Sequence, residues 1–189
     1  MIEKMAEKQN WAKLTPWLGV ATIILLFIYT SPTEVIFWAL INIPLYLFHQ
    51  TEEHYLPGGF KQYINTVINK LPEGEEILTD KKVFWINILL VWVAFSIFGV
   101  LSFVNIGFGL LIIFFSLMNC ATHIVTAIKQ KEWNPGLVIA SLQFIISIYG
   151  AYFISIYGDI SDVFAWWIAT ILFSIIVHIG IYKLAMTKN

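Results

Sequence analysis

Long apolar runs separated by short polar segments dominate the chain. Six of these runs approach or exceed the length of a membrane-spanning helix, which needs about 20 mostly apolar residues. They cover approximately residues 14–30, 32–55, 82–103, 105–128, 135–157 and 162–184. Helix-start signals precede two of them, at Ser31-Pro32-Thr33-Glu34 and at Asn134-Pro135. The pattern therefore predicts an all-α fold, in which residues 1–189 form a single integral membrane bundle of six transmembrane helices.

The one substantial loop between these runs, residues 56–82, carries a different pattern. Its apolar residues recur at helical spacing, and its polar residues fall on the opposite face: the apolar set is Phe60, Ile64, Val67, Ile68 and Leu71. This pattern predicts an amphipathic helix over about residues 59–71 on the cytoplasmic surface of the membrane. Such a helix could serve as a surface spacer or as a lid over a site at the end of the second run.

Composition agrees with a membrane protein. Apolar residues make up 59% of the chain and charged residues only 12%, whereas soluble domains carry about 25% charged residues. This excludes a soluble globular enzyme, a disordered chain and a nucleic-acid binder with a basic patch. We therefore expect membrane lipids as partners and no nucleic acid.

The positions of the basic residues along the chain indicate how the bundle is oriented in the membrane. All 11 are lysines, and six crossings would put every one of them on the same side of the membrane. Their positions are Lys4, Lys8, Lys13, Lys61, Lys70, Lys81, Lys82, Lys129, Lys131, Lys183 and Lys188. By the positive-inside rule, both termini lie in the cytoplasm. We expect the protein in the cell membrane of a prokaryote.

Ionisable residues within membrane spans are costly and tend to mark function. In the second run, His49, Glu52 and Glu53 are spaced i, i+3 and i+4 and share one helix face. In the fourth run, Asn119 and His123 are spaced i, i+4 and also share a face. The sequence therefore predicts two polar helix faces that could meet inside the bundle.

The depth of the histidines supports such a meeting. At about 1.5 Å per residue from the outer end of each span, His49, His123 and His178 lie about 22, 27 and 24 Å deep. Three helices thus bring a histidine to a similar level near the cytoplasmic face. His54 lies about 140° around the helix from His49, so we expect it outside the cluster.

These residue types suit a metal site. His49 and Glu53 can reach one ion from consecutive turns, His123 can be the third ligand, and water the fourth. Two histidines, one glutamate and an open position make a catalytic zinc arrangement, although iron and manganese also accept these ligands. Glu52 could then be the general base, and Asn119 could orient a ligand or the substrate carbonyl.

Other roles remain open for several of these residues. His178 joins the predicted metal ligands on depth alone, and taken by itself a hydrogen-bonded packing role is favoured for it. The acidic and imidazole groups of the second run could also anchor the helix at the membrane interface. In that case they would pair with nearby lysines, namely Lys61, Lys81, Lys82 or Lys129.

The order of the motifs resembles that of a known family. His49-x-x-Glu52-Glu53 is followed by Pro57-Gly58-Gly59, then by Asn119-x-x-x-His123 and Asn134-Pro135-Gly136. This combination is similar to that of the HXXEE family of membrane proteins, whose function is unknown. The resemblance runs from the second to the fifth apolar run. It implies that the motif residues act together, but it supplies no reaction.

Three hypotheses for function follow. The first is a metal-dependent membrane hydrolase acting on a lipid or another amphipathic substrate from the cytoplasmic leaflet. The second is a carrier or channel in which the same side chains bind or relay protons or a metal ion. The third is a membrane scaffold with a structural polar cluster. The outer halves of the spans are almost wholly apolar, which favours the enzyme over the carrier. The oligomeric state stays open.

Overall fold

The computed structural model describes residues 2–187, and within that range it contains helices and connecting loops but no strand. The elements in chain order are α1 (Ile2–Ala6), η1 (Glu7–Leu14), α2 (Thr15–Tyr29), α3 (Val35–Leu40), α4 (Asn42–His54), α5 (Phe60–Tyr63), η2 (Ile64–Ile68), α6 (Asp80–Asn87), η3 (Ile88–Val93), α7 (Ala94–Leu101), α8 (Gly107–Gln130), α9 (Leu137–Tyr157) and α10 (Val163–Met186). Here η1 is a 3₁₀ helix, and η2 and η3 are π-helical segments. The predicted all-α class is confirmed.

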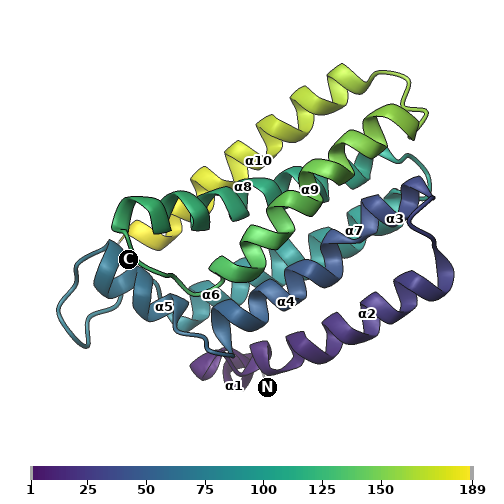
Figure 1. The fold of residues 1–189 in the computed structure, drawn as a ribbon. Helices are drawn as coiled ribbons and strands as arrows, with labels where there is room; N and C mark the ends of the chain where they lie inside the picture. Colours follow the sequence, from purple (N-terminus) through teal and green to yellow (C-terminus); the bar gives the residue numbers. More distant parts are fainter. Residues whose placement is uncertain (1, 188–189) are drawn as a thin grey trace.

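The long helices run alongside one another as a bundle (Figure 1). Helix α8 is central and packs against α3, α4, α7, α9 and α10, while α2 packs against α4. Close approach of α8 to its neighbours depends on small residues. A Cβ atom on Gly109 would lie 2.5 Å from the Cβ of Ala39, and one on Gly107 would meet the Trp166 ring.

Within residues 2–187, five helical stretches are long and apolar enough to cross a membrane, and the prediction of six was wrong in this respect. They are Ile2–Tyr29, Asp80–Leu101, Gly107–Gln130, Leu137–Tyr157 and Val163–Met186. The missing one is the run at 32–55, which forms two shorter helices: α3 ends at Leu40 and α4 begins at Asn42. Pro44 explains the interruption, because proline has no N–H to donate to the carbonyl of Leu40 and its ring crowds that carbonyl. The polar residues at the end of α4 also lower its hydropathy.

Side chains cap several of the helices. The Thr79 hydroxyl accepts a hydrogen bond from the Lys82 amide at 3.3 Å, at the start of α6. The Asp162 carboxylate accepts one from the Ala165 amide at 2.9 Å, at the start of α10. Each of these caps satisfies an amide that the helix itself leaves without a partner.

The first helix and the last turn of α10 lie at the same end of the bundle (Figure 1). There the chain turns sharply at Lys8 and Gln9, which both have positive φ angles. The turn places Trp11, which is fully buried, against the rings of His54 and Trp92. The N-terminal segment therefore closes this end of the bundle. Lys188, which contributes to the predicted charge asymmetry, lies outside the described residues.

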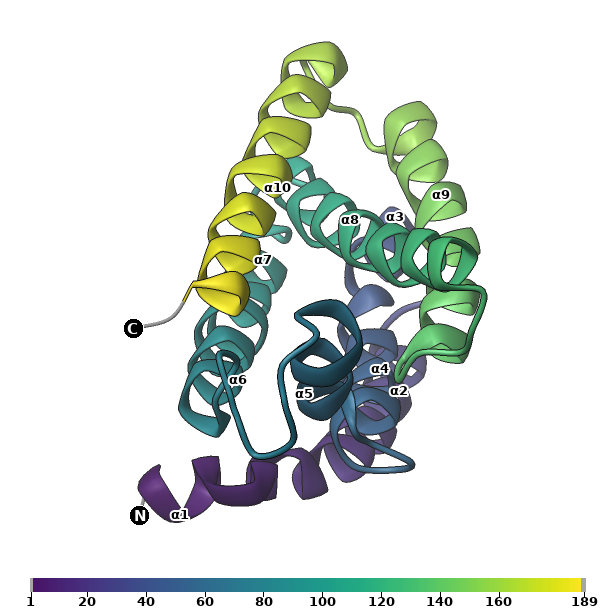
Figure 2. The same ribbon diagram turned by 90° about the vertical axis from the view of Figure 1, so that its left-hand side faces the viewer.

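A short helical segment, α5–η2, occupies the range predicted for the amphipathic helix. It lies across the same end of the bundle, as the end-on view in Figure 2 shows. Phe60 and Ile64 pack against a buried apolar cluster that includes Leu78 and Val83. Asn65 ties the segment to the following loop through its side chain. Its position on a membrane surface stays a prediction.

Candidate functional site

The last turns of α4 carry a group of polar side chains into the interior of the bundle. His49 is fully buried, and Glu53 is only 6% exposed. From α8, His123 meets them and is 4% exposed. The two polar helix faces predicted from the sequence therefore lie together beneath the N-terminal segment and α5.

His49, Glu53 and His123 form a group that could hold a metal ion. One ligand atom from each residue can be chosen so that all of them lie within 4.8 Å of one another. His49 Nε2 lies 3.5 Å from Glu53 Oε2, and His123 Nε2 lies 3.5 Å from Glu53 Oε1. In a tetrahedral zinc site with bonds of about 2.1 Å, neighbouring ligand atoms are about 3.4 Å apart. The spacing of these atoms therefore fits a metal site.

Hydrogen bonds on the far side of each imidazole orient both rings. His49 Nδ1 lies 3.1 Å from the carbonyl oxygen of Gly136, and His123 Nδ1 lies 2.7 Å from Asn134 Oδ1. The Asn134 amide nitrogen donates to the His123 carbonyl oxygen at 2.9 Å, which fixes the orientation of that amide. Each Nδ1 must therefore donate, so in a neutral ring Nε2 is the acceptor, and both Nε2 atoms lie on the side of Glu53. Metal-binding histidines almost always show this arrangement.

Asn119 also lies in the site, as the sequence predicted. Its amide nitrogen donates to His49 Nε2 at 2.9 Å. The amide lies at the edge of the cavity described below, and one helical turn along α8 from His123. It therefore occupies the position from which it could orient a ligand.

Glu52 lies beside the group but points elsewhere. Its two carboxylate oxygens accept hydrogen bonds from the amides of Val138 and Ile139, at 3.1 and 2.7 Å. These amides belong to the first turn of α9, where a negative charge is favourable. This geometry favours a helix-anchoring role for Glu52 over the role of general base that the sequence suggested.

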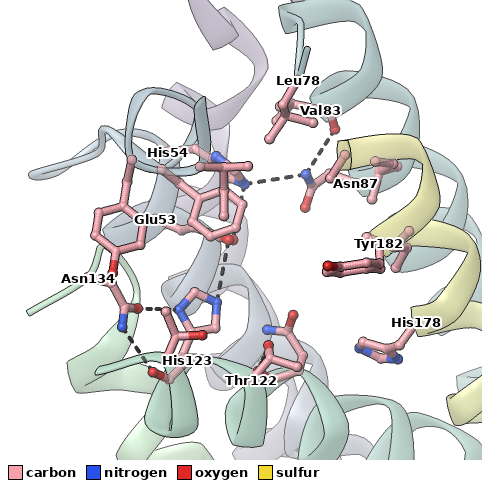
Figure 3. Close-up of a pocket in the computed structure, with 18 of the residues that line it drawn as sticks. Glu53, His54, Leu78, Val83, Asn87, Thr122, His123, Asn134, His178 and Tyr182 are labelled. Carbon is pink, nitrogen blue, oxygen red and sulfur yellow. Dashed lines mark hydrogen bonds and ion pairs between the residues drawn. The ribbon is translucent and has the colours of Figure 1, made fainter. Parts of the chain in front are cut away.

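The three residues His49, Glu53 and His123 are called the metal-type group below. His178 is separated from this group and is not part of it. Its Nδ1 lies 2.8 Å from the carbonyl oxygen of Ser174 in the preceding turn of α10. Figure 3 shows it across the cavity from Glu53 and His123. The similar depth predicted for the three histidines therefore does not bring His178 into the same group of ligand atoms as His49 and His123.

His54, which we expected outside the cluster, is part of it. Its Nε2 lies 3.1 Å from Glu53 Oε2 and 3.3 Å from the Asn87 amide nitrogen. Asn87 Oδ1 in turn accepts from Gln50 Nε2 at 2.8 Å, and Gln50 Oε1 accepts from Trp92 Nε1 at 2.9 Å. His54 follows Glu53 directly, but neighbouring residues point about 100° apart on a helix, so helical spacing gave no signal for this contact.

Two of the lysines considered as partners of the cluster, Lys61 and Lys82, have other contacts. Lys61 pairs with Glu76 at 2.7 Å and with Asp80 at 3.0 Å. Burial alone would lower the pKa of Lys61, but the hydrogen bonds that its ammonium donates to these two carboxylates, together with their charge, outweigh it and raise the pKa. Lys82 Nζ donates to backbone carbonyl oxygens, including that of Ile77 at 3.0 Å. Among the described contacts of Glu53, the charged partners are histidines.

A cavity of about 240 Å³ opens beside the cluster. Glu53, His54 and His123 form part of one wall (Figure 3). Most of the other lining side chains are apolar and come from η2, α6, η3, α8 and α10. An apolar pocket with a few convergent polar groups is the usual form of a small-molecule site.

Comparison with known proteins identifies one family. A family model described as a protein of unknown function with HXXEE motif matches residues 40–153, which is more than half of the chain. The matched range contains all the motifs that carried the resemblance, and it ends before His178. No curated protein and no solved structure matches the chain.

Proposed function

The chain belongs to the family of proteins of unknown function with the HXXEE motif, and from this premise we propose that it is a metal-dependent hydrolase within the membrane. Its substrate is a lipid or lipid-like amphiphile that enters the cavity beside the His/Glu group. The family supplies no reaction, so the proposal is supported by the site alone.

One observation carries the proposal: two imidazole lone pairs face a single carboxylate. His49 Nε2 and His123 Nε2 each lie 3.5 Å from an oxygen of Glu53, and all three groups are acceptors when the rings are neutral. The Asn119 amide donates to His49 Nε2 at 2.9 Å, so the contact without a donor is the one between His123 Nε2 and Glu53. Acceptors that converge without a cation repel one another, and this is costly in a buried site. A divalent cation between them would turn the repulsion into coordination.

Zinc is the metal that this ligand set suits best. Two histidines and one glutamate with an open fourth position are typical of catalytic zinc, and the cavity gives that position access to a substrate. Iron and manganese accept the same ligands. When bound, such a metal lowers the pKa of a coordinated water and polarises a carbonyl group.

The residues around the group have distinct roles in this proposal. Asn119 now donates to His49 Nε2 at 2.9 Å, and metal binding there would free its amide to hold a substrate carbonyl. His54, at 3.1 Å from Glu53, is the nearest group able to accept a proton. Glu52 holds the first turn of α9, and with it the Gly136 carbonyl that orients His49.

We also propose the orientation of the bundle. The site lies at the end that holds the lysine-rich segments, so we place it at the cytoplasmic face with both termini. This topology requires the interrupted pair α3–α4 to return the chain across the membrane between α2 and α6.

A proton or metal carrier would need a polar path that leads on from the cluster. The next buried polar side chains bond one another: Asn42 Oδ1 accepts from Gln143 at 3.0 Å and from Ser147 at 2.8 Å. Beyond them, apolar clusters around Ala39, Leu110 and Ile154 fill the interior. The packing therefore favours the enzyme over the carrier.

Metal analysis of the purified protein tests the proposal. Mass spectrometry of the wild type should find close to one zinc, iron or manganese per chain. Single substitutions His49→Ala, Glu53→Ala and His123→Ala should each remove most of it. The matched control is His178→Ala, which removes a histidine from the opposite wall of the same cavity and should keep the metal.

Two outcomes would overturn the proposal. One is a folded, chelator-free protein that contains no metal, which would leave a proton-sharing or structural cluster. The other is a loss of metal in His178→Ala as large as in the three ligand variants, since that would indicate a general effect of disturbing the cavity.

A further inference from the structure

The cavity wall opposite the metal-type group carries a polar atom without a partner. His178 Nδ1 lies 2.8 Å from the Ser174 carbonyl oxygen, which can only accept, so this nitrogen donates. The neutral ring then leaves Nε2 as an acceptor. Nε2 is buried and has no hydrogen-bond partner, and His178 lines the cavity (Figure 3).

The ring of His178 is held in place on its other side. Its centroid lies 4.8 Å from that of Phe115, and the hydrogen bond to Ser174 restrains the ring further. A buried acceptor without a partner is unfavourable. A ligand that donates a hydrogen bond to Nε2 would remove this cost.

The surroundings of His178 limit the chemistry of such a ligand. None of the described residues that line the cavity is a lysine or arginine, and Glu53 is the only carboxylate among them. The lining near α10 and η2 is mainly apolar, with Ile64, Ile68 and Ile181 among its residues. A ligand group with a negative charge would therefore meet no cationic side chain there.

We infer that the cavity binds an uncharged, long-chain amphiphile whose hydroxyl or amide N–H donates to His178 Nε2 while its chain packs against the apolar wall. A monoacylglycerol is the simplest molecule of this class. This inference rests on the proposed function, since it names the substrate class of the same site, but the binding that it predicts does not require hydrolysis.

A volume of about 240 Å³ agrees with this class. Pockets for drug-sized ligands usually hold about 300–1,000 Å³, so this one suits a small headgroup and the first part of a chain. The rest of the chain would extend among the lipids. His178 would then be a residue that selects the headgroup, rather than a metal ligand.

Photolabelling tests this selection. The full-length protein in lipid nanodiscs is exposed to a monoacylglycerol with a diazirine near its ester, and separately to the methyl ester of the same diazirine acid. The methyl ester keeps the chain and the carbonyl but lacks the donor. We expect the monoacylglycerol to label peptides from α8 and α10 about three- to tenfold more strongly.

Two variants of His178 separate recognition from folding. His178→Phe keeps an aromatic ring beside Phe115 but removes the acceptor, and should abolish the preference between the probes. His178→Gln keeps an acceptor and should restore part of it. Equal labelling of the wild type by both probes, or an undiminished preference in His178→Phe, would overturn the inference.

Metal content measured on the same samples distinguishes the two proposals. Loss of the preference in His178→Phe with the metal retained supports both. A metal-free wild type that still prefers the monoacylglycerol would overturn the proposed hydrolase and leave the ligand class standing.

Discussion

Gly136 approaches the two histidines more closely than a residue with a side chain could. Its φ angle is +95°, and a Cβ atom there would lie 2.6 Å from Cε1 of His49 and 3.1 Å from Cε1 of His123. Its carbonyl oxygen also lies 3.1 Å from His49 Nδ1. One backbone position therefore constrains both the packing of the two rings and the tautomer of His49.

We predict that Gly136→Ala removes metal from the protein. The new methyl group would displace His49, and the positive φ would cost about 1–2 kcal/mol in any L-residue. Gly74→Ala is the matched control, because Gly74 has φ +88° and nothing within 4 Å of its Cβ position. Both variants should lose stability in thermal unfolding, Gly136→Ala more because of the added clash, but only Gly136→Ala should lose metal on mass spectrometry. Equal metal content in the two variants would contradict this.

The sequence identified the helices of the site better than the direction of each side chain. Helical spacing correctly placed His49 and Glu53 on one face, because consecutive turns of a regular helix align. It also placed Glu52 on that face, but the free amides of α9 attract its carboxylate. His54 reaches Glu53 although it lies well around the helix from His49. Such choices depend on partners from distant parts of the chain, which spacing along one helix does not report.

At the scale of elements, the extent of each apolar run predicted where most helices begin and end to within about two residues. The runs at 105–128 and 135–157 became α8 (Gly107–Gln130) and α9 (Leu137–Tyr157). The run at 32–55 shows the limit of this reasoning. Its overall apolar character concealed the effect of Pro44, which separates α3 from α4.

The α5–η2 segment is attached to the loop that follows it mainly through Asn65. The Asn65 amide donates to the Leu78 carbonyl oxygen at 2.9 Å, and its Oδ1 accepts from the amides of Ile77 and Leu78 at 3.1 and 2.9 Å. Asn65 is only 3% exposed. Because Ile64 and Leu78 both line the cavity, this side chain joins two parts of its cover.

We predict that Asn65→Ala loosens this cover. The substitution leaves two buried amides and a carbonyl without partners, and each such loss costs about 1–3 kcal/mol. Hydrogen exchange at the amides of Ile77 and Leu78 should therefore accelerate at least about tenfold. Thr66→Ala is the control, because Thr66 is exposed and bonds only to its own helix, at the Gln62 carbonyl oxygen. Unchanged exchange in Asn65→Ala would show that apolar packing alone holds the segment.

At the scale of the whole molecule, the interrupted pair α3–α4 determines the topology. The lysine pattern was read with six crossings, whereas the described residues contain five helical stretches that are long and apolar enough to span. If α3–α4 crosses as a broken pair, both termini share one side. If it does not, the odd number of crossings separates them. Composition could not decide between these cases, because the residues that make α4 polar are also those that build the site.

Single cysteines can decide the topology. The native Cys120 is fully buried and is replaced by serine, and cysteines are introduced at exposed positions as Lys4→Cys, Thr33→Cys and Thr187→Cys. In intact cells, an impermeant maleimide should label only the Thr33→Cys variant, and cell lysis should expose the other two. If the Lys4→Cys and Thr187→Cys variants are labelled and the Thr33→Cys variant is not, the bundle has the opposite orientation and the site lies at the outer face. Labelling at one terminus only would mean that α3–α4 does not cross, and the site would then lie on a helix that enters and leaves from the same side.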